Sequence, residues 1–510
     1  MSGQKPGGVF AALFPTGAAL QRCLLRTDTG RELRYQEALE RSAAIAHLLI
    51  SVGVRAGDRV AVQVEKSPEA VLLYLATLRA GAVYLPLNSA YTAAELEYFL
   101  ADAEPSCFVC APERAAVLEP LAQRLGVRSV LTLGAAGEGT LCERARTLPA
   151  EFATVSRAPG DLAAILYTSG TTGRSKGAML TQQNLVSNAQ TLAAVWQFTP
   201  EDVLLHALPI FHIHGLFVAI NVTLAAGSQL LFLPRFDVDL LLRHLPSASV
   251  MMGVPTFYVR LLKDARLNRE LTSACRVFIS GSAPLLVETH QEWHRRTGQM
   301  ILERYGMSET GMNSSNPYDG ERIPGSVGLP LPAVELRITD TRGGAVLAAG
   351  EIGMIEVRGP NVFAGYWRQP EKTRAEFRDD GFFITGDLGR IDARGYVTIV
   401  GRAKDLVISG GYNIYPKEIE TEIDALPGVT ESAVFGVPHP DFGEGVTAAV
   451  VRAAGAPPLS EGEALAALRV RLAGYKLPKR VIFVDDLPRN SMGKVEKKLL
   501  RERYAALYVA

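Results

Sequence analysis

The sequence has few cysteines, no excess of either charge and no long apolar run. Only five of its 510 residues are cysteines, a small and odd number that suits a reducing compartment. Lysine plus arginine and aspartate plus glutamate each total 53, so no net field favours nucleic acid or an anionic membrane. No run of about 18 uncharged apolar residues occurs, the length that indicates a membrane span. A cytoplasmic chain with no nucleic-acid partner and no membrane span is therefore expected.

Fixed-period repeats and low-complexity linkers are also absent, yet the length predicts about three packing units rather than one core. Residues 34–90 alternate between helical and extended patterns. Helical patterns cover 39–52 and 68–81, and extended patterns cover 58–64 and 83–86. The alternation continues more loosely over 92–135, with a helix at 93–103 and a strand at 107–110. This rhythm predicts an α/β fold with a parallel sheet covered by helices.

The most informative stretch is residues 162–177. An apolar run over 162–167 predicts a buried strand, and a loop rich in hydroxyl groups and glycines follows. Glycines let the backbone turn tightly and approach a ligand, and consecutive N–H groups in such a turn form an anion site. A helical pattern at 184–196 then suggests a strand–loop–helix phosphate site. The candidate phosphate-binding residues are Thr168, Ser169, Gly170, Thr171, Thr172, Gly173 and Lys176.

This loop resembles the signature loop of the adenylate-forming superfamily, which includes acyl- and aryl-CoA synthetases, peptide-synthetase adenylation domains and firefly luciferase. Further stretches resemble its motifs in the same order, at 208–215, 275–285, 303–310, 381–388, 401–416 and 488–495. The resemblance covers essentially the whole chain. It implies a large N-terminal domain of several covered mixed and parallel sheets over residues 1–400. A small mobile α+β domain is implied over residues 401–510.

The resemblance also implies a nucleotide site. Tyr305 would flank adenine, Ser308 would contact phosphate, and Glu309 would bind Mg²⁺ together with Thr168, since hard oxygen ligands suit this ion. Asp387 would accept hydrogen bonds from both ribose hydroxyls. Outside the phosphate loop, the implied ATP-binding residues are Ser282, Ala283, Pro284, Glu303, Tyr305, Gly306, Met307, Ser308, Asp387 and Arg402.

Residues of the implied acyl pocket include an arginine. Arg304 stands where many members carry glycine or alanine, and a buried arginine is costly unless it is paired. A second carboxylate on the substrate would be a bidentate partner; an internal aspartate or glutamate is the alternative. His212 would border the pocket and steer the substrate carboxylate, and zinc binding by His212 and His214 is disfavoured because no further ligand is near. The implied substrate-binding residues are His212, Ser280, Arg304 and Met307.

The C-terminal motifs imply catalysis by a moving domain. Lys494 matches the catalytic lysine, which would bridge the substrate carboxylate and the α-phosphate. Lys404 falls on the hinge position, where small changes in φ and ψ swing a domain. Gly410 and Gly411 would lie beside the CoA tunnel. A lysine acetyltransferase that modified Lys494 would remove its positive charge and stop adenylation.

The implied activity is AMP-forming ligation of an acid to CoA with MgATP. Arg304 and the motifs around it look most similar to those of malonyl-CoA synthetases, acting on malonate or methylmalonate. The alternatives are a fatty- or aryl-acid CoA ligase and a free-standing adenylation enzyme that loads a carrier protein. A non-catalytic nucleotide sensor is a further alternative, against which the presence of both Lys494 and Glu309 argues.

Overall fold

The computed structural model describes residues 8–168, 175–341, 344–409, 412–457, 459–490 and 493–508. The chain divides into two compact units. Unit 1 comprises Met1–Glu335 and Val357–Phe383, and unit 2 comprises Leu336–Glu356 and Ile384–Ala510. The large N-terminal and smaller C-terminal parts confirm the expected α/β fold class, and unit 2 also takes in segments that precede residue 401. None of the helices in the described ranges combines the length and apolarity needed to cross a bilayer.

The first sheet of unit 1 follows the β–α–β rhythm of the sequence. Five of its strands are parallel, and the last pairs antiparallel with its neighbour. In spatial order they are β6 (Ser129–Thr132), β5 (Cys107–Cys110), β3 (Arg59–Gln63), β4 (Val83–Pro86), β7 (Leu162–Thr168) and β8 (Lys176–Thr181). Helices α3 (Pro68–Arg79), α4 (Ala93–Ala103) and α5 (Ala115–Arg124) connect the parallel strands.

The second sheet of unit 1 has nine strands. In spatial order they are β15 (Leu329–Pro330), β14 (Gly311–Ser315), β13 (Ile301–Met307), β12 (Val277–Ser280), β11 (Val250–Gly253), β9 (Val203–His206), β10 (Gln229–Phe232), β1 (Cys23–Thr27) and β2 (Glu32–Arg34). The strands from β13 to β1 are parallel. Their carboxyl ends therefore share one edge of the sheet, the usual place for a ligand site in an open α/β sheet.

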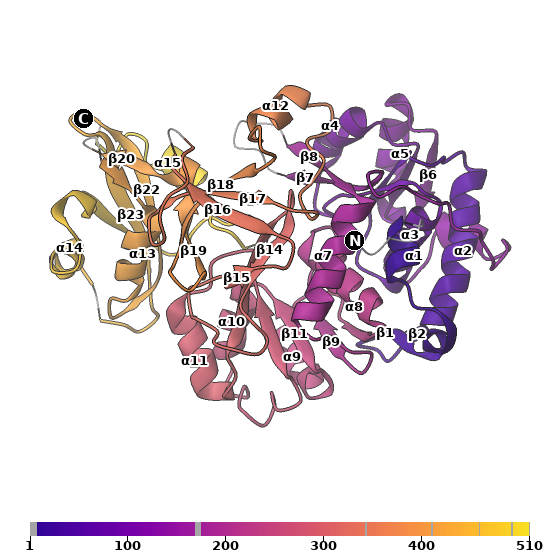
Figure 1. Cartoon of the computed structure of the whole chain (residues 1–510), viewed down its shortest axis with the longest axis horizontal. Helices are drawn as coiled ribbons and strands as arrows, with labels where there is room; N and C mark the ends of the chain where they lie inside the picture. The colour runs from indigo at the N-terminus through magenta and orange to yellow at the C-terminus, as the bar shows by residue number, and fades with distance from the viewer. Residues whose placement is uncertain are drawn as a thin grey trace. The chain divides into compact units, whose positions relative to one another are not determined.

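A continuous hydrophobic core joins the two sheets of unit 1. All twelve residues of α3 are buried, as expected for a helix covered on every side. Helices α1 (Gly8–Leu13), α7 (Gln182–Val195) and α8 (Asn221–Ala226) contribute to the same core. The remaining helices are α2 (Tyr35–Ser51), α6 (Thr140–Ala145), α9 (Val238–His244), α10 (Pro255–Leu262), α11 (Val287–Thr297) and α12 (Pro370–Ala375). Figure 1 shows α9 and α10 beside β11.

Unit 2 contains two smaller sheets. The first orders β16 (Glu335–Thr339), β17 (Gly353–Arg358), β18 (Phe383–Ile391) and β19 (Val397–Arg402). The second contains β21 (Tyr412–Ile414), β20 (Val407–Ser409), β23 (Gly443–Arg452), β22 (Val429–His439) and β24 (Arg480–Val484). Its helices are α13 (Pro416–Asp424), α14 (Glu461–Arg469) and α15 (Lys497–Arg503). Short helical turns elsewhere are η1 (Gly17–Gln21), η2 (Pro112–Arg114), η3 (His214–Ile220), η4 (Leu245–Ser247), η5 (Ala403–Asp405) and η6 (Gly474–Lys476).

The helix expected at 184–196 is confirmed as α7, which spans Gln182–Val195. Strand β8, which the sequence did not indicate, precedes this helix and pairs antiparallel with β7. Backbone bonds between Met179 and the 364–365 segment (2.9 Å each) hold the other edge of β8. Pairing with β7 on one edge and with the 364–365 segment on the other therefore stabilises β8 as a strand, although it is short and contains Gly177. The described strands on either side of the predicted phosphate loop, β7 and β8, are therefore antiparallel neighbours.

Candidate active site

The phosphate loop is anchored by its two ends. Ser169, Gly170, Thr171, Thr172 and Gly173 lie outside the described residues. Thr168 and Lys176, the predicted ligands on either side, are paired across β7 and β8. The Thr168 hydroxyl lies 3.5 Å from the carbonyl oxygen of Lys176. Register between the two strands thus fixes where the loop starts and ends.

The predicted metal ligands come together. Thr168 Oγ1 lies 3.4 Å from Glu309 Oε1, although the two residues are far apart in sequence. Glu309 is buried, and its carbonyl oxygen accepts a hydrogen bond from Phe363 N–H (2.8 Å). Among the described residues, no three or more histidine, cysteine or carboxylate side chains are grouped so that they could hold a metal ion by themselves. One carboxylate and one hydroxyl fit Mg²⁺, which usually keeps waters and binds substrate phosphates rather than an all-protein cage.

Two residues beside these ligands were missed from the sequence. Tyr366 Oη lies 2.7 Å from Glu376 Oε2 and 3.2 Å from Glu309 Oε1. Lys176 Nζ lies 3.2 Å from Glu376 Oε1 and 4.3 Å from the centre of the Tyr366 ring. Tyr366 and Glu376 flank helix α12, and nothing periodic in the sequence relates them to the loop.

Strand β13 carries the predicted adenine-side residues. Tyr305 is buried, and a bulge in the pairing with β14 falls between Tyr305 and Gly306. A Cβ at Gly306 would lie 2.1 Å from the Gly311 carbonyl oxygen, so no larger residue fits there. Met307 and Ser308 follow and are partly exposed. The bulge turns this end of the strand while keeping it in the sheet.

Glu303 is held by the protein itself. Its Oε1 accepts a hydrogen bond from Gly325 N–H (3.1 Å) and lies 3.2 Å from His290 Nδ1. Burial raises its pKa. Its backbone carbonyl accepts a hydrogen bond from Asn316 N–H at 2.9 Å. These contacts tie β13 to the 316–325 segment, and a direct contact of Glu303 with ATP stays a prediction.

The turn after β12 has an unusual backbone. Ser282 has φ of 73°, a left-handed conformation that is uncommon for residues other than glycine. Its hydroxyl lies 3.3 Å from His214 Nδ1. Ala283 and Pro284 continue the turn, with Pro284 exposed. The strained turn thus joins the predicted purine-side loop to the histidine segment.

Arg304 is the central charge of the predicted acyl pocket. It is 3% exposed, and its Nε and Nη2 have no hydrogen-bond partner among the described residues. A Cβ at Gly281 would lie 2.5 Å from its guanidinium carbon, so the group packs directly on that glycine. Ser280 Oγ is also buried without a partner within these ranges. Burial lowers the pKa of Arg304 to about 9, so the group remains charged at neutral pH.

Two histidines follow β9 on the segment that leads into η3. His212 precedes η3, with its ring 4.8 Å from that of Phe211. His214 is 1% exposed. Burial, followed by the charges of Arg304 and two other histidines, holds its pKa well below the usual value. His214, for which no role was predicted, is therefore a neutral neighbour of Arg304.

A lysine that was also missed supports this segment from behind. Lys66 Nζ lies 2.7 Å from His206 Nδ1 and 2.8 Å from the His206 carbonyl oxygen. His206 Nε2 in turn lies 2.7 Å from the Gly215 carbonyl oxygen. A carbonyl only accepts, so Nε2 carries the proton and Nδ1 accepts from Lys66. This chain links the loop after β3 to the turn that carries His212 and His214.

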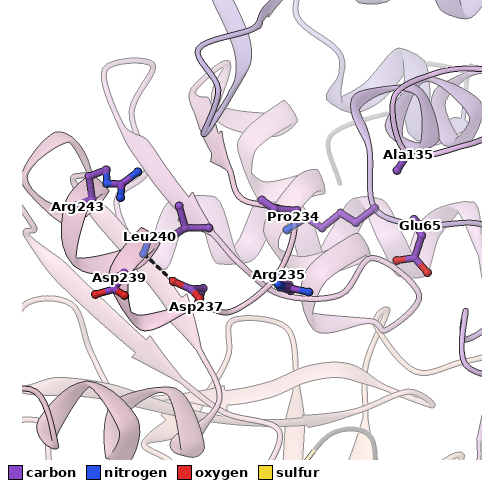
Figure 2. Close-up of a pocket in the computed structure, with 9 residues that line it drawn as sticks. Glu65, Ala135, Pro234, Arg235, Asp237, Asp239, Leu240 and Arg243 are labelled. Carbon is purple, nitrogen blue, oxygen red and sulfur yellow. Dashed lines mark hydrogen bonds between the residues drawn. The ribbon is translucent and has the colours of Figure 1, made fainter.

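Lys66 also lines a cavity of about 380 Å³. Figure 2 shows charged side chains of both signs around it, with Asp237 Oδ1 accepting from Leu240 N–H (2.9 Å) at the start of α9. The lining residues are Glu65, Lys66, Ala135, Pro234, Arg235, Asp237, Asp239, Leu240 and Arg243. None of them belongs to the predicted site.

In unit 2, two predicted nucleotide ligands pair with each other. Arg402 Nε lies 2.9 Å from Asp387 Oδ1, because β18 and β19 place the two residues opposite one another. Lys404 lies in η5 and burial lowers its pKa. The backbone N–H of Lys494 donates to Asn490 Oδ1 at 3.0 Å. Gly410 and Gly411 lie outside the described residues.

Comparison with known proteins decides the family. Residues 10–367 match the AMP-binding enzyme family, and residues 418–494 match the AMP-binding enzyme C-terminal domain. The chain belongs to this adenylate-forming family. Its fold and its sequence motifs agree with that membership over nearly the whole chain.

The relatives of this chain include ligases that are named for different acids. The crystal structure of ATP-bound MatB from Rhodopseudomonas palustris is 58% identical, with a TM-score of 0.97, 99% of this chain covered and 100% of that one. A mitochondrial malonate–CoA ligase of Mus musculus is 37% identical over 92% of this chain and 87% of its own length. A long-chain-fatty-acid–CoA ligase of Bacillus subtilis is 34% identical over 96% and 92% respectively.

Proposed function

We propose that this protein is a malonyl-CoA synthetase, which joins malonate to CoA at the expense of MgATP through a malonyl-AMP intermediate. The observation that carries the proposal is Arg304, a buried guanidinium with two nitrogens that lack partners among the described residues. The malonate–CoA ligase of Mus musculus and the structural similarity to MatB support it.

Family membership alone does not fix the acid, since a fatty-acid ligase is also a relative. Arg304 favours a diacid because the internal alternative is not met: no aspartate or glutamate forms an ion pair with it within the described ranges. A substrate with two carboxylates would expose one to adenylation and pair the other with Arg304. Methylmalonate has the same two charges and is the second candidate substrate.

In the first half-reaction, a carboxylate oxygen of malonate attacks the α-phosphorus of ATP. The bond from that phosphorus to the bridging oxygen breaks, and pyrophosphate leaves. Two anions must meet, so charge neutralisation and positioning supply most of the catalysis. Lys176 and the loop at 169–173 would hold the outer phosphates, and Lys494 would bridge the carboxylate and the α-phosphate. Mg²⁺ held by Thr168 and Glu309 would neutralise phosphate charge.

In the second half-reaction, the CoA thiol loses its proton and its sulfur attacks the acyl carbon, so that AMP leaves. Water must be kept from the adenylate between the steps. We propose that Lys404 is the hinge for a domain movement that replaces Lys494 by Gly410 and Gly411 beside the thiol. Acetylation of Lys494 by a lysine acetyltransferase would stop the first step. The low cysteine content favours a cytoplasmic location.

The test is AMP release by the purified protein with malonate, methylmalonate, butyrate, octanoate or benzoate, each with and without CoA. We expect kcat/KM for malonate or methylmalonate to exceed that for butyrate by about 10²-fold or more, because an uncharged tail leaves Arg304 unpaired. Thioester should form only when CoA is present. Equal turnover of octanoate or benzoate would show that the acid is misassigned.

A further inference from the structure

The hydroxyl of Tyr366 lies between two carboxylates. It is 2.7 Å from Glu376 Oε2 and 3.2 Å from Glu309 Oε1. A tyrosine hydroxyl has one proton to donate, and the shorter contact is the typical O–H···O distance. Tyr366 therefore donates chiefly to Glu376, and the same hydroxyl also lies within donating distance of the predicted metal carboxylate, Glu309.

Glu376 also fixes the ammonium group of Lys176. Its Oε1 lies 3.2 Å from Lys176 Nζ and 2.8 Å from Lys372 Nζ. Burial opposes ionisation of Glu376, but hydrogen bonds from Lys372 and Tyr366 and the charge of Lys176 lower its pKa overall. One carboxylate thus joins both lysines to the tyrosine.

The Tyr366 ring limits Lys176 from a second direction. Lys176 Nζ lies 4.3 Å from the ring centre, within cation–π range, and its side chain is only 10% exposed. A lysine ammonium has three donors on a flexible stem. The Glu376 carboxylate and the face of the Tyr366 ring together restrict the Lys176 side chain. The remaining N–H donors of its ammonium group can then point toward a phosphate.

The backbone holds this arrangement in place. Phe363 N–H bonds the Glu309 carbonyl oxygen (2.8 Å), and Trp367 N–H bonds the Gly177 carbonyl oxygen (2.7 Å). The 363–367 segment therefore contacts both Glu309, the predicted metal ligand, and β8, the strand that begins at Lys176.

From these contacts we propose that Tyr366 and Glu376 are positioning residues for the nucleotide triphosphate. Glu376 aims the Lys176 ammonium at phosphate, and Tyr366 fixes the Glu309 carboxylate for its cation. Both residues act through Lys176 and Glu309. The inference rests on the proposed use of MgATP, but it does not depend on which acid is activated.

The test measures nucleotide binding by calorimetry, with no acid present. Glu376→Gln keeps the size of the side chain and removes its charge. We expect it to weaken MgATP binding about tenfold, the scale of one charged hydrogen bond. Tyr366→Phe keeps the ring over Lys176 and removes the hydroxyl. We expect it to raise the Mg²⁺ concentration needed for half-maximal ATP binding about threefold or more.

Matched controls are Glu371→Gln, an exposed acid of helix α12, which ends just before Glu376, and Tyr91→Phe, a tyrosine outside this cluster. Both should bind MgATP like the wild type. In the Lys176→Met background, Glu376→Gln should cause no further loss, because a positioning residue has no effect once its target is gone.

Wild-type affinity in both variants, or an additive loss from Glu376→Gln in the Lys176→Met background, would overturn the inference. Equal losses with and without Mg²⁺ in Tyr366→Phe would overturn the tyrosine's part. If the wild type bound MgATP but did not use malonate, only the proposed substrate would fail. Absence of MgATP binding by the wild type would refute both proposals.

Discussion

The predicted site in unit 1 has a phosphate end, around Lys176 and Glu309, and an acyl end, around Arg304. The two ends balance their charges in different ways. At the phosphate end Lys176 has a carboxylate partner in Glu376, and Glu309 has hydroxyl neighbours in Thr168 and Tyr366. At the acyl end no described carboxylate pairs with Arg304. The first end is a set of internal contacts, and the second leaves a buried cation without a protein counter-ion.

This difference explains how one fold can keep its nucleotide chemistry while its acid changes. Internal ion pairs keep the geometry of the phosphate end largely independent of the acid. A lone buried cation instead makes the acyl end depend on what the substrate brings, because a site built for a charged group rejects analogues that lack it. His206 and His214 are neutral, so neither adds a positive charge to that of Arg304.

The largest expected effect comes from removing Lys494, the predicted catalytic lysine, while the phosphate and acyl ends stay intact. Lys494→Ala should lower adenylate formation by about 10²- to 10³-fold or more, the scale of one lost transition-state donor. Thioester formation from pre-made malonyl-AMP should change little. ATP–pyrophosphate exchange and single-turnover thioester assays measure the two steps. Comparable loss in both would contradict the separation of the half-reactions.

Arg304→Ala is the next largest and tests the comparison directly. Loss of one partner of a buried charged pair costs about 3–5 kcal/mol, which is about 10²- to 10³-fold in kcat/KM for malonate. Activity with butyrate should fall far less or rise, and the KM for ATP should hold. Steady-state kinetics on the two acids measures this, with Arg295→Ala, an exposed arginine of α11, as the control. Proportionate losses on malonate and butyrate would make Arg304 structural.

Lys66→Met should have a smaller effect, confined to the acyl end. His206 would lose the donor to its Nδ1, and the turn that carries His212 and His214 would lose part of its support. We expect the KM for malonate to rise about tenfold, the scale of one hydrogen bond to a charged group, with the KM for ATP unchanged. The exposed neighbour Glu65→Gln is the control. An equal rise in both KM values would mean that Lys66 stabilises the unit as a whole.

Much of this site could be predicted from sequence, and the exceptions have a common cause. The helix predicted at 93–103 and the strand predicted at 107–110 coincide with α4 and β5, since each depends on its own local pattern. Arg304 could be singled out because it adjoins a specific motif. Its lack of an internal partner, however, depends on which side chains β12 and β13 bring near it, and no local pattern encodes that.

Tyr366, Glu376 and Lys66 were missed for the same reason. Tyr366 reaches Glu309 only because the 363–367 segment runs along β8 and the metal-ligand loop. Lys66 reaches His206 only because the carboxyl ends of β3 and β9, in two different sheets, lie near each other. Strand β8 was not predicted from the sequence, and one of its two edges is held by the distant 364–365 segment. Contacts between distant segments, rather than local propensity, determine these features.

The smallest effect is expected from pH. The preference for malonate over butyrate should not change near neutral pH, because the charge at the acyl end is that of Arg304 and not of a histidine. Burial lowers the pKa of Arg304 to about 9, so its charged form persists below that pH and is lost as pH rises through it. His206 and His214 have pKa values well below the usual one, chiefly because of burial, and therefore stay neutral.

The ratio of kcat/KM for malonate to that for butyrate should be constant between about pH 6.5 and 8. The Arg304→Ala variant should show an equally flat but much lower ratio over the same range. A decline of the ratio already near neutral pH would mean that a histidine, rather than Arg304, carries the charge that selects the diacid.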